Sequence, residues 1–193
     1  MRPVQRPKAP AIEYKTYQSY LTPLLNAFGQ HCSYCERLEK LDVEHVVPKS
    51  KLAGKDLTLQ WSNLLLGCAR CNRDFKKNIN DNRDNHLWPD EANTFLAYRY
   101  FTDGRVTVAP QLSAIEQQKA QNTLELVKLD DGIELQNVLN IHRRTQFKIA
   151  NIALRAYING HQTLQEILVQ AIYAWSVWVT VFNYDNKQRL YLA

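Results

Sequence analysis

The chain has 193 residues, of which 45% are hydrophobic and 22% are charged, which is the composition of a folded globular protein with a buried core. Its six glycines and seven prolines exclude collagen-like and low-complexity sequences. The formal net charge of +5 is modest, and it favours an anionic partner without establishing one.

The residue pattern predicts an α+β fold in two parts. After an extended, proline-rich arm, we expect a helix over 14–28 that Pro23 kinks or divides, strands over 41–47 and 64–67, a helix over 69–78 and a hairpin over 94–108. The later apolar spacing predicts helices over 113–129, 135–157 and 164–182. We therefore divide the chain into domains at 1–110 and 111–193, and we expect the helical second domain to serve docking or assembly.

The uncharged segment 167–184 is 18 residues long, at the lower limit of a membrane span. It contains several polar residues, so we interpret it as a buried or interface helix and expect no membrane association. Trp178 lies beside its apolar stripe, and we expect it to anchor a protein interface, the alternative being that it packs inside the chain. The N-terminus lacks the apolar core of a signal peptide, so we expect a cytoplasmic protein with reduced thiols.

Four cysteines form two Cys-x-x-Cys pairs separated by 32 residues. Such pairs suit a tetrahedral zinc site, in which each pair supplies two thiolates. We therefore predict that structural Zn²⁺ is held by Cys32, Cys35, Cys68 and Cys71. The alternatives are a redox Cys-x-x-Cys or four unrelated core thiols, but a redox site needs only one such pair.

The segment between the cysteine pairs carries an acid–histidine pair, Glu44-His45, at the end of a predicted strand. Neighbouring residues on a strand point to opposite faces, so the two can act together only where the strand ends, and Pro48 indicates that end. Further along, Asn63 precedes the second predicted strand and Asn72 follows Cys71.

At these residues the chain resembles the HNH endonucleases, also called ββα-metal or His-Me finger nucleases. Their motif has a Cys pair, an acid–His pair ending a strand, an Asn before a second strand, and Cys-x-x-Cys-Asn opening a helix. A closer resemblance, to the HNH nuclease of Septu anti-phage systems, which is also found as an effector in some retrons, covers about residues 1–108. The strings 32–37, 43–50, 87–89 and 93–95 carry it. The resemblance implies a small zinc-braced ββα-metal core within residues 1–110 and an ATPase partner.

The resemblance also implies roles for the four polar residues. His45 would be the general base, since an imidazole of ordinary pKa is largely neutral at pH 7. Asn63 would brace the loop that carries His45 and orient its ring. Glu44 and Asn72 would hold one catalytic Mg²⁺ or Mn²⁺ through oxygen atoms.

The chain departs from the family pattern at two positions. Many members have Asp in place of Glu44, and many have Lys three residues after the final Asn, where this chain has Phe75. The phosphate contact of that Lys then falls to one of the nearby basic residues, which give the segment 68–77 a local charge of +3 near a helix N-terminus. We predict nucleic-acid contacts by Arg70, Arg73, Lys76 and Lys77, the alternative being a solvated helix face.

The leading interpretation is therefore a metal-dependent endonuclease that acts on DNA or RNA. One alternative is a non-catalytic zinc-binding nucleic-acid module, which would have no use for the Glu44-His45 pair. The other is an assembly subunit that works through its C-terminal helices.

Overall fold

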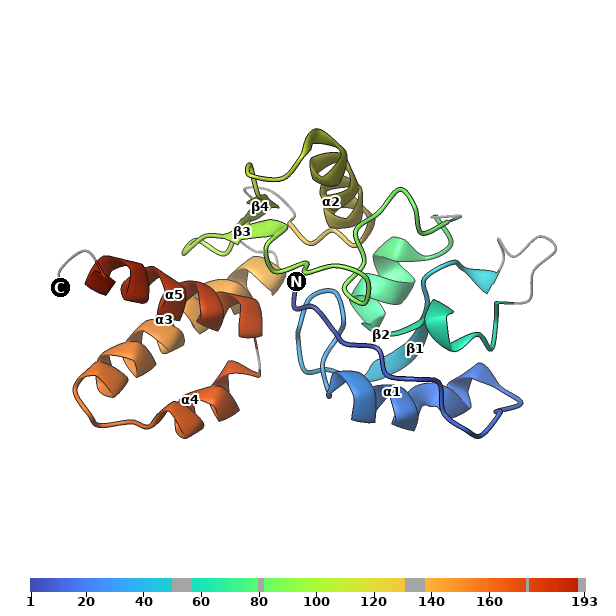
Figure 1. Ribbon diagram of the computed structural model, residues 1–193, viewed down its shortest axis with the longest axis horizontal. Helices are drawn as coiled ribbons and strands as arrows, with labels where there is room; N and C mark the ends of the chain where they lie inside the picture. The colour runs from blue at the N-terminus through green and yellow to red at the C-terminus, as the bar shows by residue number, and fades with distance from the viewer. Residues whose placement is uncertain (50–56, 80–81, 131–137, 173, 191–193) are drawn as a thin grey trace. The chain divides into compact units, whose positions relative to one another are not determined.

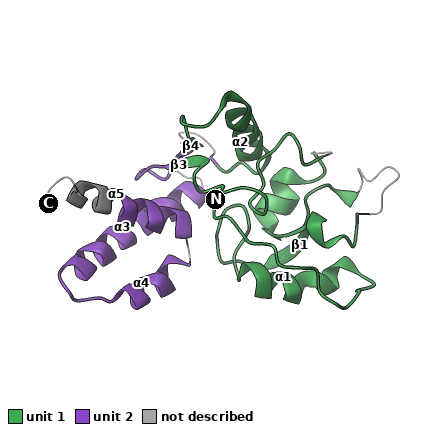
Figure 2. Ribbon diagram, viewed as in Figure 1, with its two compact units in different colours: residues 1–98, 108–129 green, residues 99–107, 130–193 purple. Residues whose placement is uncertain are grey.

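The computed structural model describes residues 1–49, 57–79, 82–130, 138–172 and 174–190. The chain forms two compact units (Figure 2): unit 1 holds 1–98 and 108–129, and unit 2 holds 99–107 and 130–193. The α+β class is confirmed, since small sheets and several helices occur together. The units do not follow the predicted division at residue 110, because the first helix beyond it packs with unit 1.

Unit 1 begins with an arm without regular structure, as predicted. Arg6 ties this arm to the rest of the unit, donating to Asp90 Oδ2 and to the carbonyl oxygens of Trp61 and Leu64. A 3₁₀ helix, η1 (Tyr17–Tyr20), then continues into α1 (Leu21–Phe28). The predicted helix over 14–28 is therefore divided. Pro23 lies in the first turn of α1, where the N–H that proline lacks has no partner within the helix.

The centre of unit 1 is an antiparallel pair of strands, β1 (Leu41–His45) and β2 (Leu64–Cys68), against which α1 packs (Figure 1). Both strands agree with the prediction. The short 3₁₀ helix η3 (Trp61–Asn63) leads into β2, whose residues are all buried. In the register, His45 at the end of β1 faces Leu64 at the start of β2. The acid–histidine pair therefore lies at the same end of the sheet as Asn63.

The helix after β2, η4 (Arg70–Lys76), is confirmed in place but differs in type, because it is a π-helix. The N–H of Lys77 donates to the carbonyl oxygen of Asn72 at 2.8 Å, five residues back. A turn closed over five residues is wider than that of an α-helix, and such turns are frequent at functional sites. The side chains that share a face of this helix therefore differ from those of the predicted α-helix.

Unit 1 is completed by α2 (Ala114–Leu126), which begins with a capping box between Ser113 and Glu116. The predicted hairpin is present as β3 (Tyr98–Tyr100) and β4 (Val106–Val108). Its turn, over residues 101–105, belongs to unit 2.

Unit 2 contains α3 (Val138–Ile158), α4 (Leu164–Ala171) and α5 (Trp175–Leu190). The prediction of one helix over 164–182 is wrong, because α4 ends at Ala171 and a new helix starts at Trp175. The break lets α4 and α5 both pack on α3, as the buried cluster of the unit shows. Its members are Phe147, Ala150, Ala153, Ile167, Ala171, Ala174, Val177, Trp178 and Val181. No helix in the described part of the chain is long and apolar enough to cross a bilayer.

The apolar stripe of the predicted third helix is only partly buried. Leu164, Leu168 and Ile172 are exposed, whereas Trp178 has 2% of its surface exposed. The Trp178 indole N–H donates to Gln146 Oε1 at 3.0 Å, and its ring stacks on Phe182. The prediction of Trp178 as an interface anchor is therefore wrong, since this residue packs inside unit 2.

Gly104, in the turn between β3 and β4, has a φ of +88°, so we expect its replacement by a larger residue to lower the stability of the protein. A Cβ there would lie 2.2 Å from the Asn140 carbonyl oxygen, and Arg143 donates to the Gly104 carbonyl oxygen at 2.6 Å. We expect Gly104→Ala to lower the free energy of unfolding by more than about 2 kcal/mol in urea titrations, because steric overlap adds to left-handed strain.

The matched control is Gly160→Ala. Gly160 has a φ of +72°, but an added Cβ would meet nothing within 4 Å. This variant should show only the left-handed penalty, about 1 kcal/mol. Equal losses for the two variants would contradict the steric argument.

Candidate active site

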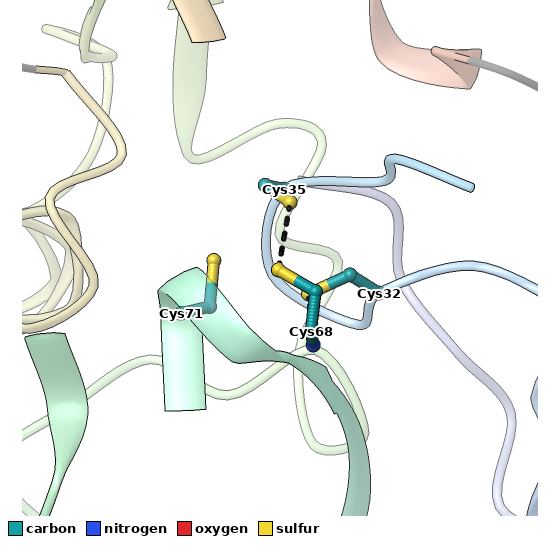
Figure 3. Close-up of side chains that lie close together, drawn as sticks. All are labelled: Cys32, Cys35, Cys68 and Cys71. Atoms are coloured by element: carbon teal, nitrogen blue, oxygen red, sulfur yellow. Dashed lines mark hydrogen bonds between the residues drawn. The ribbon is translucent and has the colours of Figure 1, made fainter. Parts of the chain in front are cut away.

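The four cysteines meet in one cluster beside the sheet, with all four sulfur atoms within 4.8 Å of one another (Figure 3). Cys32 and Cys35 come from the loop before β1, Cys68 ends β2 and Cys71 lies in η4. All four are free thiols, and Cys35 Sγ lies 3.7 Å from Cys68 Sγ. The prediction that the two pairs form one site is confirmed.

The electrostatics of the cluster favour a cation. Hydrogen bonds from Cys32, Cys35 and Cys71 lower the pKa of the Cys68 thiol, whereas the pKa values of Cys35 and Cys71 are raised by the sulfurs around them. Four thiolates together need a cation such as Zn²⁺, for which four sulfurs are a standard tetrahedral ligand set.

His45 ends β1 in a defined orientation. Its Nε2 lies 3.0 Å from the carbonyl oxygen of Thr58, which can only accept a hydrogen bond. Nε2 therefore carries the proton, and Nδ1 of the neutral ring keeps its lone pair. Burial is the main cause of a lowered pKa for His45. The ring also packs edge-on against Tyr17, with ring centroids 4.8 Å apart. His45 is thus neutral at pH 7, with a proton-accepting nitrogen available.

Asn63 holds the chain just after His45. Its side-chain Oδ1 accepts from the Val47 N–H at 2.8 Å, and its Nδ2 donates to the Val47 carbonyl oxygen at 3.0 Å. The Asn63 carbonyl oxygen also accepts from the Val46 N–H. These bonds connect the start of β2 to the end of β1 and restrict the backbone that carries His45.

Glu44 is buried and both of its carboxylate oxygens have partners. Tyr34 donates its hydroxyl to Oε2 at 2.7 Å, and the Lys76 ammonium lies 2.6 Å from Oε1. The same ammonium donates to the His45 carbonyl oxygen at 2.7 Å. The Glu44 carboxylate is therefore buried beside a positive charge, the Lys76 ammonium.

Asn72 and Glu44 share the space over Gly67. A Cβ at Gly67 would lie 2.9 Å from Asn72 Cβ and 3.1 Å from Glu44 Cβ, so only glycine allows the two side chains this approach. A carboxylate and an amide oxygen on one face are a donor set that suits Mg²⁺ or Mn²⁺. These residues fit a hard divalent cation.

A cleft of about 410 Å³ on the surface of unit 1 is lined by His45 and Asn72, whereas Glu44 is buried and is not part of its lining. It is lined by Tyr17, Gln18, Leu21, Asp42, Val43, His45, Lys49, Asn72 and Arg73. His45 and Asn72 therefore face the same space, with Lys49 and Arg73 beside them. The Lys49 ammonium lies 4.1 Å from the centroid of the Tyr17 ring. The cleft can accept an anionic chain next to a neutral imidazole.

The four predicted nucleic-acid contacts divide into two groups. Arg73 and Lys77 are exposed, with 64% of the Arg73 side chain open to solvent. Arg70 instead donates to the carbonyl oxygens of Val127 and Lys128 beyond the end of α2. Lys76 is fully buried on Glu44, so the prediction that it contacts nucleic acid is wrong.

Sequence reasoning missed Tyr17 and the pairing of Glu44 with Tyr34 and Lys76. Tyr17 belongs to a helix outside the motif, and its spacing indicates only an amphipathic helix. Tyr34 stands between two cysteines, a position that suggests core packing. Nothing in the sequence indicated that Lys76 pairs with Glu44, because α-helical spacing does not predict a π-helix.

Part of the chain is similar to known proteins. Residues 32–78 match the family model of the HNH endonucleases, which confirms the resemblance for this segment. Septu protein PtuB of Bacillus mycoides (strain KBAB4) is 33% identical over 86 residues. That match covers 37% of this chain and 29% of the relative's length. The segment that contains the cysteine cluster, His45 and Asn72 therefore matches the family model of the HNH endonucleases.

Proposed function

We propose that this chain is a metal-dependent HNH endonuclease that hydrolyses phosphodiester bonds in nucleic acid as the effector of a cytoplasmic anti-phage defence complex. The observation that carries the proposal is the cleft in which a neutral His45 and Asn72 face two basic side chains. The HNH match and the similarity to a Septu protein support the same activity. A zinc-binding module without catalysis would not need His45 held in one tautomer.

In this mechanism His45 is the general base. With Nε2–H donated to Thr58, the free Nδ1 accepts a proton from the attacking water. Asn63 is a positioning residue, because its bonds to Val47 hold the backbone next to His45. A positioned base of this kind contributes about 10²- to 10⁴-fold to the rate.

Glu44 and Asn72 would hold the catalytic Mg²⁺ or Mn²⁺, with Gly67 allowing both side chains to approach. When bound, the metal supplies neutralisation of charge on the scissile phosphate and on the leaving oxygen. Cys32, Cys35, Cys68 and Cys71 would hold a structural Zn²⁺. The two metal sites use different donor atoms, sulfur for zinc and oxygen for the catalytic ion.

The nucleic-acid strand would follow the basic rim of the cleft. Arg73 is exposed and lies 3.7 Å from Asp42, a weak surface pair that a phosphate can replace. Lys49 lies over Tyr17, and Lys77 is exposed at the end of η4. Lys49 and Arg73 line the cleft with His45 and would guide the backbone toward it.

The test is a cleavage assay on supercoiled plasmid and on total RNA, with Mg²⁺ or with EDTA. The chain is assayed alone and together with the ATPase that we propose as its partner. Cleavage with Mg²⁺ that EDTA abolishes supports the proposal. Binding of nucleic acid without cleavage under every condition would instead favour the non-catalytic zinc-binding module.

A binding prediction follows for Arg73. We expect Arg73→Gln to weaken nucleic-acid binding and to reduce the slope of log affinity against log salt by about one. Salt-dependent fluorescence anisotropy with a labelled oligonucleotide measures both. Lys148→Gln, on the exposed face of α3 in unit 2, is the control with the same change in net charge. Equal slopes for the two variants would remove Arg73 from the interface.

For docking to an ATPase partner, the exposed apolar side chains of unit 2 are the candidate surface. They include Ile141, Ile152, Leu164, Leu168, Val169 and Ile172. Because Trp178 is internal, the test uses Leu168→Asp, which should weaken co-purification with the ATPase and leave zinc content unchanged. Unchanged co-purification would place the contact elsewhere.

A further inference from the structure

Lys76 is fully buried in unit 1, next to the acid–histidine pair Glu44-His45. Its ammonium contacts two oxygens, Glu44 Oε1 at 2.6 Å and the His45 carbonyl oxygen at 2.7 Å. Burying a charged lysine costs free energy unless the ammonium is paired, and here it is paired with the Glu44 carboxylate. The protein therefore places a fixed positive charge next to its acid–histidine pair.

That charge lies on the carboxylate that we assign to the catalytic metal. Oε2 of Glu44 accepts a hydrogen bond from the Tyr34 hydroxyl at 2.7 Å. The Lys76 ammonium lies on Oε1. A divalent ion bound to this carboxylate would lie close to the ammonium, and the repulsion between the two cations in a buried site is strong.

The π-helix explains how Lys76 reaches this position. The wide turn closed by the Lys77 N–H and the Asn72 carbonyl oxygen lies directly over Gly67. Asn72 and Lys76 both belong to this turn; Asn72 Cβ and Glu44 Cβ both lie close to Gly67, and the Lys76 ammonium contacts the Glu44 carboxylate. The same helical turn therefore carries Asn72, the proposed oxygen ligand, and Lys76, the competing cation.

We propose that Lys76 is an internal counterion that holds Glu44 before the catalytic metal binds, so that the metal must displace its ammonium from Oε1. This inference rests on the proposed function, because it assumes that Glu44 and Asn72 form a divalent-cation site. The displaced ammonium keeps the His45 carbonyl oxygen as a partner. Lys76 thus lowers the affinity for the metal and stabilises the metal-free protein.

The test compares Lys76→Met with Lys148→Met in the zinc-loaded chain. Lys148 is exposed on α3 in unit 2, so the control removes the same charge without touching Glu44. Isothermal titration with Mn²⁺ should show at least about tenfold tighter binding for Lys76→Met than for wild type, because the competing cation is gone. Its melting temperature should be lower without Mn²⁺ and should rise more on addition of Mn²⁺. Lys148→Met should match wild type in both measurements.

Each other outcome has a clear meaning. Equal or weaker Mn²⁺ affinity in Lys76→Met would overturn the counterion role and leave the metal site standing. Absence of Mn²⁺ binding in wild type and variant alike would overturn the metal site and the inference together. If Lys76→Met does not fold, Lys76→Gln keeps a hydrogen-bond donor without the charge and should also bind Mn²⁺ more tightly. Adding Glu44→Gln to either variant should abolish the gain.

Discussion

Replacement of His45 by alanine is expected to lower the rate of nucleic-acid cleavage by about 10²- to 10⁴-fold, the contribution of a positioned general base. The variant loses the free Nδ1 that the hydrogen bond from Nε2 to Thr58 leaves available. Single-turnover cleavage of plasmid with saturating Mg²⁺ is the measurement, because it reports the chemical step without product release.

The variant must be compared with wild type for zinc content, melting temperature and oligonucleotide affinity, all of which should be unchanged. The cysteine cluster does not include His45, so its zinc does not depend on this side chain. Wild-type cleavage by a folded, zinc-loaded His45→Ala protein would show that another group is the base.

The pH dependence of the same reaction has a definite sign. Burial lowers the pKa of His45, so the neutral, proton-accepting form predominates above a pKa that is lower than the usual value of about 6.5. The wild-type rate should therefore rise with pH on the acid side, with the midpoint of the rise below about pH 6.5. A midpoint above this pH would contradict a buried, neutral imidazole as the base.

Replacement of Cys68 by serine is expected to cause the largest loss of stability. Serine is similar in size but does not supply the thiolate that completes the tetrahedral set, and Cys68 is fully buried. Structural zinc binding is worth about 10–16 kcal/mol in small zinc domains, and much of it is folding free energy. A loss of only about 3 kcal/mol would lower the melting temperature by about 6–12 °C.

Zinc removal from the wild-type protein provides the comparison. A strong chelator should lower the melting temperature to the value of Cys68→Ser and should have no further effect on that variant. Elemental analysis should find one zinc per wild-type chain. A stable wild-type protein without zinc would show that the four cysteines form a core cluster that needs no metal.

The cysteine pairs, the two strands and the hairpin turn could be predicted from the sequence because each depends on the types and spacing of a few residues. Alternating apolar residues identified β1, a short apolar run identified β2, and the Asp103-Gly104 pair identified the hairpin turn. The two Cys-x-x-Cys pairs predicted one site, and their sulfurs lie together. Spacing sufficed here, since a metal imposes its own geometry on four thiols.

Elsewhere, tertiary packing overruled the local pattern. The apolar repeat over 164–182 continues without glycine or proline, yet the chain breaks between Ala171 and Trp175. α4 and α5 pack on α3 as separate helices, and Ile167 from one and Trp178 from the other join the same buried cluster. An apolar repeat indicates which residues become buried, whereas packing against the neighbouring helices determines where the chain bends.

The sequence by itself determined the HNH domain, the cysteine cluster and the identity of His45, Asn63 and Asn72 as neighbours of the site. These depend on residue type and on short spacing along the chain. Only the tertiary structure decided which basic residues face the cleft. Arg73 is exposed, whereas Lys76, three residues later, is buried on Glu44. The reason is the π-helix, whose wider turn changes the face on which each side chain lies.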